Sequence, residues 1–415
     1  MTRCLSLVAV LMAGTAAHAA EPVGADAFNF DAGIDLAALG PDTFADIVGP
    51  AAAEEGGLTF FDFTNSFGPL FQEHLIPAFE EKTGLAVDYI RGDGNTAVQQ
   101  LVAALNAGRA APADVYFIGS GSSFSTLLAE DAIANIALHE VLPSATNLDP
   151  ALATVAAGNV HGGIYLPFHR NQTSIVYNSD MVGTEELPLT VEALLDYATA
   201  NPGAVAVTNP TRGGSGNGFL QSVANAVVEG EDCRAVFADY EITREAADAW
   251  AAGECAAPLW AYYTALLPVV ELTNGNSDTL NLIANGAAAI GTGWEDMAYD
   301  FLGRGLLPPS TRQALLETGQ VGGGDGMFLP VGAENVAAGL AFLDFMISHE
   351  VQLVKLSVNG SRSARTDIDP AAEFSPEQAA RLIPTDQFAT RTLPQMPNPL
   401  KDAMGDYFTA NVLRN

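Results

Sequence analysis

The sequence has few basic residues, and this shortage excludes one class of partner. Its 415 residues include 17 lysines and arginines against 49 aspartates and glutamates, which gives a formal net charge of −32 and a pI near 4.2. A surface of this sign repels nucleic acid and anionic lipid, so neither is expected as a partner. An acidic surface also suits a secreted protein, and salt screens its field beyond about 8–10 Å. The charge alone therefore does not identify a ligand.

Long apolar runs are missing after the first twenty residues. A membrane helix needs about 20 apolar residues, and no later segment has them, so we expect no stable membrane anchor. At the N-terminus, Arg3 precedes a short apolar run from Leu5 to Gly14, and Ala17-His18-Ala19 fits a cleavage site. We predict a cleaved signal peptide over residues 1–19; a buried N-terminal helix is the alternative. Cys4 lies too early for lipoprotein cleavage.

The chain has only three cysteines, and this limits its redox and metal chemistry. Cys4 would leave with the signal peptide, while Cys233 and Cys255 would remain as an even pair in an oxidising compartment. We predict a disulfide between them, as a staple within a helical segment. No histidine or further cysteine lies at ligand spacing, so we predict neither a metal site nor a cofactor.

The familiar catalytic motifs are also absent. A serine-hydrolase elbow needs G-x-S-x-G, but the run from Gly213 to Asn217 fails at its last position. Neither His139-Glu140 nor His349-Glu350 continues into H-E-x-x-H, and no phosphate-binding glycine motif is complete. We therefore predict that the protein is not an enzyme. A secreted hydrolase stays the alternative class, because glycosidase carboxylate pairs cannot be seen from spacing.

The chain does contain two stretches of alternating strands and helices. Between residues 58 and 131, three β-rich runs alternate with three helical patterns, and a similar alternation follows residue 190. Such alternation is typical of mainly parallel sheets with helices on their faces. Residues 20–56 show little periodicity, and we expect an extended lead-in that could hold one short helix. No internal repeat is present, which argues against an adhesive surface protein.

Two turns in the first alternating stretch are candidate ligand sites. In open α/β sheets, ligands bind where strands end and helix N-termini offer free N–H groups. Asp62, Asn65 and Ser66 follow the first strand, and they could bind a solute or cap the next helix. Ser120 and Ser122 follow the third strand between glycines and could bond an anionic or hydroxyl group. A plain capped turn is the alternative.

The second stretch has two more candidate turns of different chemistry. Arg212 and Ser215 lie in a glycine-rich turn that could hold a carboxylate or a phosphate. Trp294 and Glu295 follow a short strand, and an indole beside a carboxylate suits an organic cation. Both sets together would suit a zwitterion or a polar molecule with a phosphate.

Five further residues are candidates on weaker grounds. Asn171 and Gln172 connect the two stretches, where a ligand contact is plausible. Trp260 and Tyr262 belong to an aromatic cluster for which core packing is the alternative. Asp325 lies between glycines and could face a cleft or only turn the chain.

Five short motifs, each weak alone, occur in an order that resembles a known family. They look like those of type II periplasmic solute-binding proteins of ABC importers, in the branch that includes thiamine, polyamine and iron receptors. The motifs are Phe79-Glu80-Glu81-Lys82-Thr83-Gly84, Ala113-Asp114-Val115, Leu166-Pro167-Phe168 with Ile175-Val176-Tyr177-Asn178, Asn285-Gly286-Ala287-Ala288-Ala289-Ile290-Gly291, and the helix from Ala341 to Gln352.

The resemblance implies a fold, a location and a role. The fold would be α/β, with two lobes joined by a hinge: residues 57–168 with 321–349, and residues 169–320 with 350–415. The implied role is a periplasmic, monomeric receptor that captures a small polar or charged solute between the lobes and delivers it to ABC importer permease subunits. We favour an amine- or thiamine-like solute; the alternatives are a phosphate- or carboxylate-bearing solute or ferric ion.

Overall fold

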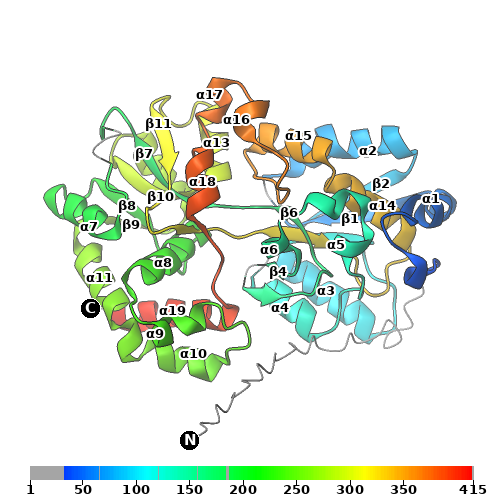
Figure 1. Cartoon of the computed structure of the whole chain (residues 1–415), viewed down its shortest axis with the longest axis horizontal. Helices are drawn as coiled ribbons and strands as arrows, with labels where there is room; N and C mark the ends of the chain where they lie inside the picture. Colours follow the sequence, from blue (N-terminus) through cyan, green and yellow to red (C-terminus); the bar gives the residue numbers. More distant parts are fainter. Residues whose placement is uncertain (1–31, 65, 120, 157, 184–186, 414–415) are drawn as a thin grey trace, which may run out of the picture.

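The structure is a computed structural model, and it describes residues 32–64, 66–119, 121–156, 158–183 and 187–413 (Figure 1). The predicted signal peptide lies outside these residues. Two five-stranded sheets, each covered by helices, lie side by side and are joined by connecting segments in the middle of the molecule (Figure 1). The architecture confirms the predicted two-lobed α/β fold. Each sheet is mixed, however, with two parallel and two antiparallel strand pairings, where mainly parallel sheets were expected.

The first lobe is built on the sheet with strand order β2-β1-β3-β13-β6. Its first three strands in sequence are parallel, whereas β13 runs antiparallel to both of its neighbours. The strands are β1 (Gly57–Asp62), β2 (Ala86–Arg91), β3 (Val115–Ile118), β6 (Leu166–His169) and β13 (Asp325–Phe328), with a small hairpin of β4 (Val155–Ala156) and β5 (Asn159–Val160). The helices are η3 (Leu70–Leu75), α2 (Ile76–Thr83), α3 (Gly94–Asn106), α4 (Ser122–Ala129), α5 (Leu138–Val141), η4 (Pro143–Asn147), α6 (Pro150–Ala153) and α14 (Val336–Met346).

Local sequence explains why these elements begin and end where they do. Every residue of β3, Val-Tyr-Phe-Ile, is buried, as expected of a central strand covered on both faces. Gly84 ends α2 in the left-handed conformation, with φ of 75°, which a side chain would disfavour. Asp93 caps α3 through the Thr96 N–H. The capped helix therefore starts directly after β2, at the edge of the sheet where the cavity described below opens.

The described part of the predicted lead-in is more ordered than expected. It contains η2 (Leu36–Ala38) and the 12-residue helix α1 (Phe44–Glu55). Phe44, Val48 and Ala52, spaced four apart, are buried in the core that α14 also enters. The Glu55 carboxylate accepts hydrogen bonds from the Ala337 and Ala338 N–H groups at the start of α14. The helix that the expectation allowed is therefore present as α1, but the segment is not merely extended, because the apolar face of α1 packs against α14, a partner that only the fold provides.

The second lobe is built on the sheet with strand order β11-β7-β10-β8-β9. Strand β7 is antiparallel to β10 and β11, whereas β8 is parallel to β10 and β9. The strands are β7 (Thr173–Asn178), β8 (Val205–Thr208), β9 (Glu271–Thr273), β10 (Ile290–Trp294) and β11 (Thr311–Ala314). The helices are α7 (Val191–Ala200), α8 (Gly214–Val227), α9 (Glu231–Arg234), η6 (Ala235–Phe237), α10 (Arg244–Ala251), η7 (Glu254–Ala256), α11 (Ala257–Leu266), η8 (Leu267–Val269), α12 (Asn276–Ala284) and α13 (Glu295–Gly303).

The predicted disulfide is present in this lobe. Cys233 in α9 is bonded to Cys255 in η7, with their Cα atoms 5.3 Å apart. The bond closes a segment that holds α10, whose Trp250 donates its indole N–H to the Cys233 carbonyl at 2.9 Å. The disulfide thus ties α9 to η7 across a helical segment that contains no strand of the sheet.

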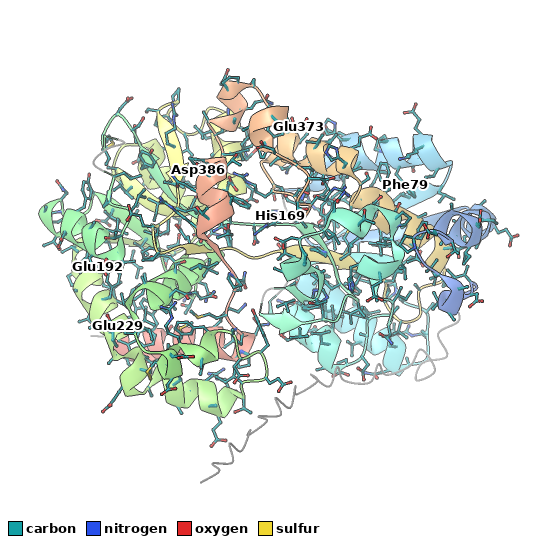
Figure 2. All side chains as sticks on the ribbon, viewed as in Figure 1. Phe79, His169, Glu192, Glu229, Glu373 and Asp386 are labelled. Atoms are coloured by element: carbon teal, nitrogen blue, oxygen red, sulfur yellow. A yellow bond between two sulfur atoms is a disulfide. The ribbon has the colours of Figure 1, made fainter. Side chains whose placement is uncertain are left out.

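Three connections join the lobes. Arg170, Asn171 and Gln172 link β6 to β7, and the short strand β12 (Gln320–Val321) leads back towards β13. Helix α15 (His349–Asn359) touches both lobes: Val351 packs in the core of the first, and Leu356 packs with Tyr299 of α13. Figure 2 shows His169 where these segments meet, and its Nδ1 lies 2.5 Å from Ser361 Oγ.

The last described elements of the chain lie on the second lobe. After α16 (Pro370–Glu373), α17 (Pro376–Ala379) and α18 (Thr385–Arg391), it passes through β14 (Thr392–Leu393) to α19 (Asn398–Tyr407) and η9 (Phe408–Val412). We call residues 392–398 the C-terminal strap; it runs between α18 and α19 in Figure 1. Strand β14 pairs in parallel with β12, and α19 packs against α10.

No single helix among the described residues is long and apolar enough to cross a membrane. Only α14 and α15 together reach that length and composition, and the pair is bent by 63°.

Candidate functional site

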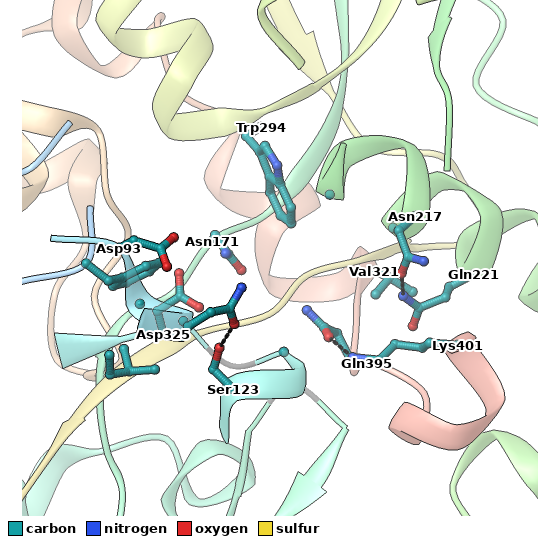
Figure 3. A pocket seen from close by; sticks show the side chains of 18 residues that line it. Asp93, Ser123, Asn171, Asn217, Gln221, Trp294, Val321, Asp325, Gln395 and Lys401 are labelled. Carbon is teal, nitrogen blue, oxygen red and sulfur yellow. Dashed lines mark hydrogen bonds between the residues drawn. The ribbon is translucent and has the colours of Figure 1, made fainter. Parts of the chain in front are cut away.

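A cavity of about 460 Å³ lies between the lobes (Figure 3). Both lobes, the connecting segments and the C-terminal helix contribute side chains to it. The lining residues are Phe63, Asp93, Gly94, Asn95, Ile118, Gly119, Gly121, Ser123, Asn171, Gly214, Asn217, Gly218, Gln221, Trp294, Val321, Asp325, Gln395 and Lys401.

The wall formed by the first lobe is acidic. Asp93 accepts hydrogen bonds at 2.8 Å from the Thr96 N–H and hydroxyl, and these bonds lower the pKa of its carboxyl. Asp325, the first residue of β13, adds a second carboxylate beside it in Figure 3. Asn95 accepts a hydrogen bond from Ser123 across the same wall. The two carboxylates make this wall suitable for a cationic group.

Asn171 adds an acceptor at the centre of the cavity. Its Oδ1 is buried and has no hydrogen-bond partner among the described residues. A Cβ on Gly323 would lie 2.8 Å from this oxygen, so glycine at that position leaves the amide its space. A buried acceptor without a partner is costly, and a donor on a ligand would satisfy it.

The second lobe contributes an indole and one face of a helix. Trp294 ends β10, and Figure 3 shows its ring extending into the cavity. A Cβ on Gly214 would lie 2.7 Å from the ring, so this glycine makes room for the indole. Gly214, Asn217, Gly218 and Gln221 line the cavity at helical spacing along α8.

The C-terminal segment brings a cation to the cavity. Lys401 of α19 donates to Gln395 Oε1 of the strap at 2.7 Å. Burial lowers the pKa of Lys401 to about 8, although the nearby carboxylates of Asp402 and Asp325 act in the opposite direction. The strap is held to α8 by the Met396 N–H, which donates to Gln221 Oε1 at 2.9 Å.

Three of the residues proposed from the sequence line this cavity: Asn171, Trp294 and Asp325. Asn65 and Ser120 lie outside the described residues, and the side chain of Ser122 is also outside them. The turn that contains Ser120 and Ser122 does reach the cavity through Gly119, Gly121 and Ser123.

The other residues of the first candidate turn have a structural role. Asp62 is buried; its Oδ1 accepts from the Thr64 N–H, and its Oδ2 accepts from the Tyr89 hydroxyl, both at 2.7 Å. Burial raises the pKa of its carboxyl. Ser66 is exposed, and its carbonyl accepts from Asn359 at 3.4 Å. Neither lines the cavity, and Asp62 does not cap the next helix either, because that helix begins after Pro69 without a side-chain cap; Asp62 instead ties the turn to β2 through Tyr89.

The glycine-rich turn does not form the expected anion site. Arg212 is exposed and does not line the cavity. The hydroxyl of Ser215 is buried; it donates to Asn276 Oδ1 at 2.8 Å and lies 3.0 Å from the Thr208 hydroxyl. The side chain therefore fastens the start of α8 to α12 and to the end of β8.

Gln172 and Glu295 are buried between the lobes instead of facing the cavity. Gln172 Nε2 donates to the Gln320 carbonyl at 2.8 Å. The Glu295 carboxylate accepts from Arg362 Nη2 at 2.8 Å and from the Ile383 N–H at 2.7 Å. Glu295 was paired with Trp294 because the two are adjacent, but the chain turns from β10 into α13 between them and separates their side chains.

The aromatic cluster is part of the core. Trp260 stacks on Tyr407 with ring centroids 4.8 Å apart and donates its indole N–H to the Ala251 carbonyl. Tyr262 donates its hydroxyl to the Val191 carbonyl at 3.0 Å. Neither lines the cavity, so the alternative of core packing is the one observed.

Several cavity residues were missed, and some had a signal in the sequence. Asp93 and Asn95 follow β2 and so occupy a strand-end turn like those that were considered. Asn217 and Gln221 are polar residues four apart on one helix. Gln395 and Lys401 had no local signal, because they reach the cavity only through the return of the chain to β12. Among the described residues, no group of three or more histidines, cysteines or carboxylates is placed to hold a metal ion.

Comparisons with known proteins agree with this arrangement. Solved structures that share the fold include an ABC transporter protein from Clostridium perfringens, with a TM-score of 0.63 and 12% identity over 86% of this chain and 99% of that chain. The spermidine/putrescine substrate-binding protein PotD from Streptococcus pneumoniae has a TM-score of 0.60 and 16% identity over 85% of this chain and 97% of that chain. The periplasmic binding protein AfuA from Actinobacillus pleuropneumoniae, with fructose-6-phosphate bound, has a TM-score of 0.57 and 15% identity over 87% of this chain and 100% of that chain. No curated protein matches the sequence. The model of the bacterial extracellular solute-binding protein family matches residues 74–381, well over half of the chain. The chain therefore belongs to the bacterial extracellular solute-binding protein family.

Proposed function

We propose that this protein captures an organic solute carrying an ammonium or other cationic group and delivers it to the permease subunits of an ABC importer. It acts in the periplasm after cleavage of residues 1–19, as a monomer without a membrane anchor, and catalyses no reaction. The lobes are residues 57–168 with 321–349 and residues 169–320 with 350–415, and α1 joins the first of them.

One observation carries the choice of a cation: Asp93, Asp325 and Trp294 line the same cavity. Two carboxylates attract a cation, and an indole face adds a cation–π interaction of about 0.5–2 kcal/mol. The unsatisfied Oδ1 of Asn171 requires a donor, which an ammonium group supplies. The polyamine receptor among the structures of the same fold is consistent with an amine ligand.

The alternative solutes have less support. A phosphate- or carboxylate-bearing solute was expected to use Arg212, which does not line the cavity. Ferric ion prefers hard oxygen ligands such as those of tyrosines with carboxylates, but Tyr262 and Tyr263 are buried in the core around α11. The fructose-6-phosphate bound to AfuA keeps a sugar phosphate on the list of compounds to test.

Thermal shift and calorimetry on the mature protein test the proposal. The panel holds diamines, thiamine, quaternary amines, amino acids, sugar phosphates and ferric ion. A ligand at about 100 times its Kd should add roughly 2.7 kcal/mol to the unfolding free energy. We expect the shift from a compound with an ammonium or quaternary amine group, and its loss in Trp294→Ala and Asp325→Asn but not in Arg212→Ala. A shift from a sugar phosphate that Arg212→Ala removes would refute the cationic assignment.

A further inference from the structure

The two ends of the cavity have opposite charge. Asp93 and Asp325 belong to the first lobe, whereas Lys401 reaches the cavity from α19, which packs on the second lobe. In Figure 3 the two carboxylates lie on one side of Trp294, and Lys401 with Gln395 lies on the other. A ligand that spans the cavity therefore meets acceptors at one end and a cation at the other.

Helix α8 adds partial positive charge to the second-lobe wall of the cavity, where its first residue, Gly214, lies against the Trp294 ring. Gly214, the first residue of the 14-residue helix α8, lines the cavity, so the partial positive charge of the helix N-terminus acts there. Gln221 Nε2 donates to Asn217 Oδ1 at 2.7 Å. This bond occupies the acceptor oxygen of Asn217. The donor, Asn217 Nδ2, has no hydrogen-bond partner among the described residues. The second-lobe wall thus offers donors where the first-lobe wall offers acceptors.

A buried polar group in the segment that connects the lobes independently indicates a donor on the ligand. Asn171 Oδ1 is buried without a partner in the described part of the chain, and it lies between the indole of Trp294 and the carboxylate of Asp325 in Figure 3. An ammonium group at this place would donate to the amide oxygen and neutralise the carboxylates. The same group placed at the other end would face Lys401, and like charges in contact are strongly unfavourable.

We propose, on the basis of the proposed function, that the ligand is a zwitterion whose ammonium group lies against Asp93, Asp325 and Asn171 and whose carboxylate faces Lys401 and the start of α8. The apolar part of the ligand packs between Trp294 and Phe63. Because each end binds a different lobe, the ligand holds the lobes together and favours the closed form over the open one.

Matched ligands separate a zwitterion from a simple diamine. Calorimetry compares 1,4-diaminobutane, 4-aminobutanoate and butanedioate, which have the same number of carbons and differ only in their end groups. The ω-amino acids with three, five and six carbons and the common α-amino acids extend the series of lengths. We expect at least one amino acid to bind and both the diamine and the diacid to bind at least roughly 100-fold more weakly.

Two variants with a control assign the ends. Lys401→Met should weaken the amino acid at least roughly tenfold and strengthen the diamine, because it removes the cation that repels the second ammonium. Asp325→Asn should weaken both ligands. Lys82→Met serves as the control, since Lys82 lies over the Phe345 ring in the first lobe and not at the cavity. Circular dichroism and Tm confirm that each variant is folded.

The results distinguish this inference from the proposed function. If the diamine binds at least as tightly as every amino acid, or if Lys401→Met leaves the ratio of their affinities unchanged, the zwitterion assignment is wrong while the proposed cationic receptor stands. If no ligand with a cationic group binds, both proposals fail.

Discussion

Arg362 and Glu295 form a buried ion pair in which Nη2 lies 2.8 Å from Oε1 and Nε lies 3.0 Å from Oε2. Arg362 follows α15, and Glu295 opens α13, so the pair joins two segments that are far apart in sequence. The guanidinium also lies 4.1 Å from the centroid of the Phe388 ring and donates to the Ile383 carbonyl. The carboxylate first assigned to the ligand is thus part of the structure between the lobes.

Glu295→Gln should destabilise the protein without a specific loss of ligand affinity. Removing one member of a buried pair leaves the other charge uncompensated, and the expected loss in unfolding free energy is about 3–5 kcal/mol. Denaturant unfolding measures it. Asp300→Asn is the control, because the exposed Asp300–Arg304 pair should contribute no more than about 0.5 kcal/mol. Equal effects of the two substitutions would contradict the structural role of Glu295.

Replacing Trp294 by alanine should lower ligand affinity, whereas replacing Trp260 by alanine should lower stability. Trp294→Ala removes an aromatic wall of the cavity, so we expect Kd to rise at least tenfold, about 1.4 kcal/mol, with a small change in Tm. Trp260→Ala empties part of the second-lobe core and should cost about 3–5 kcal/mol of stability. Calorimetry and thermal unfolding of both variants give the comparison. A loss of affinity in folded Trp260→Ala would place that residue back at the ligand.

Asp296 at the start of α13 should make the unfolding free energy depend on pH. Burial, with help from the nearby Glu295 and Asp325 charges, raises the pKa of Asp296 to about 7 from its usual 3.8, and Oδ1 has no hydrogen-bond partner among the described residues. The folded protein therefore holds a proton that the unfolded chain releases. This contribution to stability is present below about pH 4 and is lost as the pH rises to about 7, at about 1.4 kcal/mol per pKa unit.

Comparison of the native protein with Asp296→Asn isolates this effect. Its neighbour His169, with Nε2 3.7 Å from Asp296 Oδ2, has its pKa lowered well below 6.5 by burial. His169 therefore acts in the opposite direction, because the unfolded chain binds its proton first as the pH falls. Both proteins contain His169, so the difference between their unfolding free energies should decline from pH 4 to 7 and then level. A difference that does not change with pH would rule out the raised pKa.

The disulfide should stabilise the second lobe without affecting the ligand. Replacing Cys233 and Cys255 together by alanine should lower the unfolding free energy by about 3 kcal/mol, because the bond closes a loop of 22 residues. Neither cysteine lines the cavity, so Kd should stay the same. A reducing agent should reproduce the loss in the native protein and have no effect on the double variant. A large change in Kd would show that the staple also shapes the cavity.

The strap should contribute to closure of the lobes. Asn398 Nδ2 donates to Ser125 Oγ of α4 at 3.0 Å, which joins the C-terminal segment to the first lobe beside the cavity. Asn398→Ala should weaken the closed form by about 1 kcal/mol, or roughly fivefold in Kd. Small-angle scattering with and without ligand measures closure. Asn411→Ala is the control, because Asn411 bonds to Tyr407 within its own helical segment. An unchanged Kd in Asn398→Ala would show that this contact does not stabilise the closed form.

The three predicted residues that line the cavity show what local patterns can predict. Asn171, Trp294 and Asp325 were chosen because each lies where a strand ends or where the two stretches connect, and the ends of strands meet at the edge of a sheet. Asp62, Ser215 and Glu295 satisfied the same rule, but neighbouring donors and acceptors occupy their side chains. The rule identifies the turns, and it cannot tell which polar group in a turn is already satisfied.

By itself, the sequence determined the alternation of strands and helices, the pairing of the two cysteines and the class of fold. These properties depend on periodicity and on residues that are close along the chain. Only the tertiary structure decided that α1 covers the first lobe, that Arg362 neutralises Glu295, and that Lys401 faces Asp93 and Asp325 across the cavity. Such contacts join segments more than 60 residues apart, and their formation depends on how the whole chain packs.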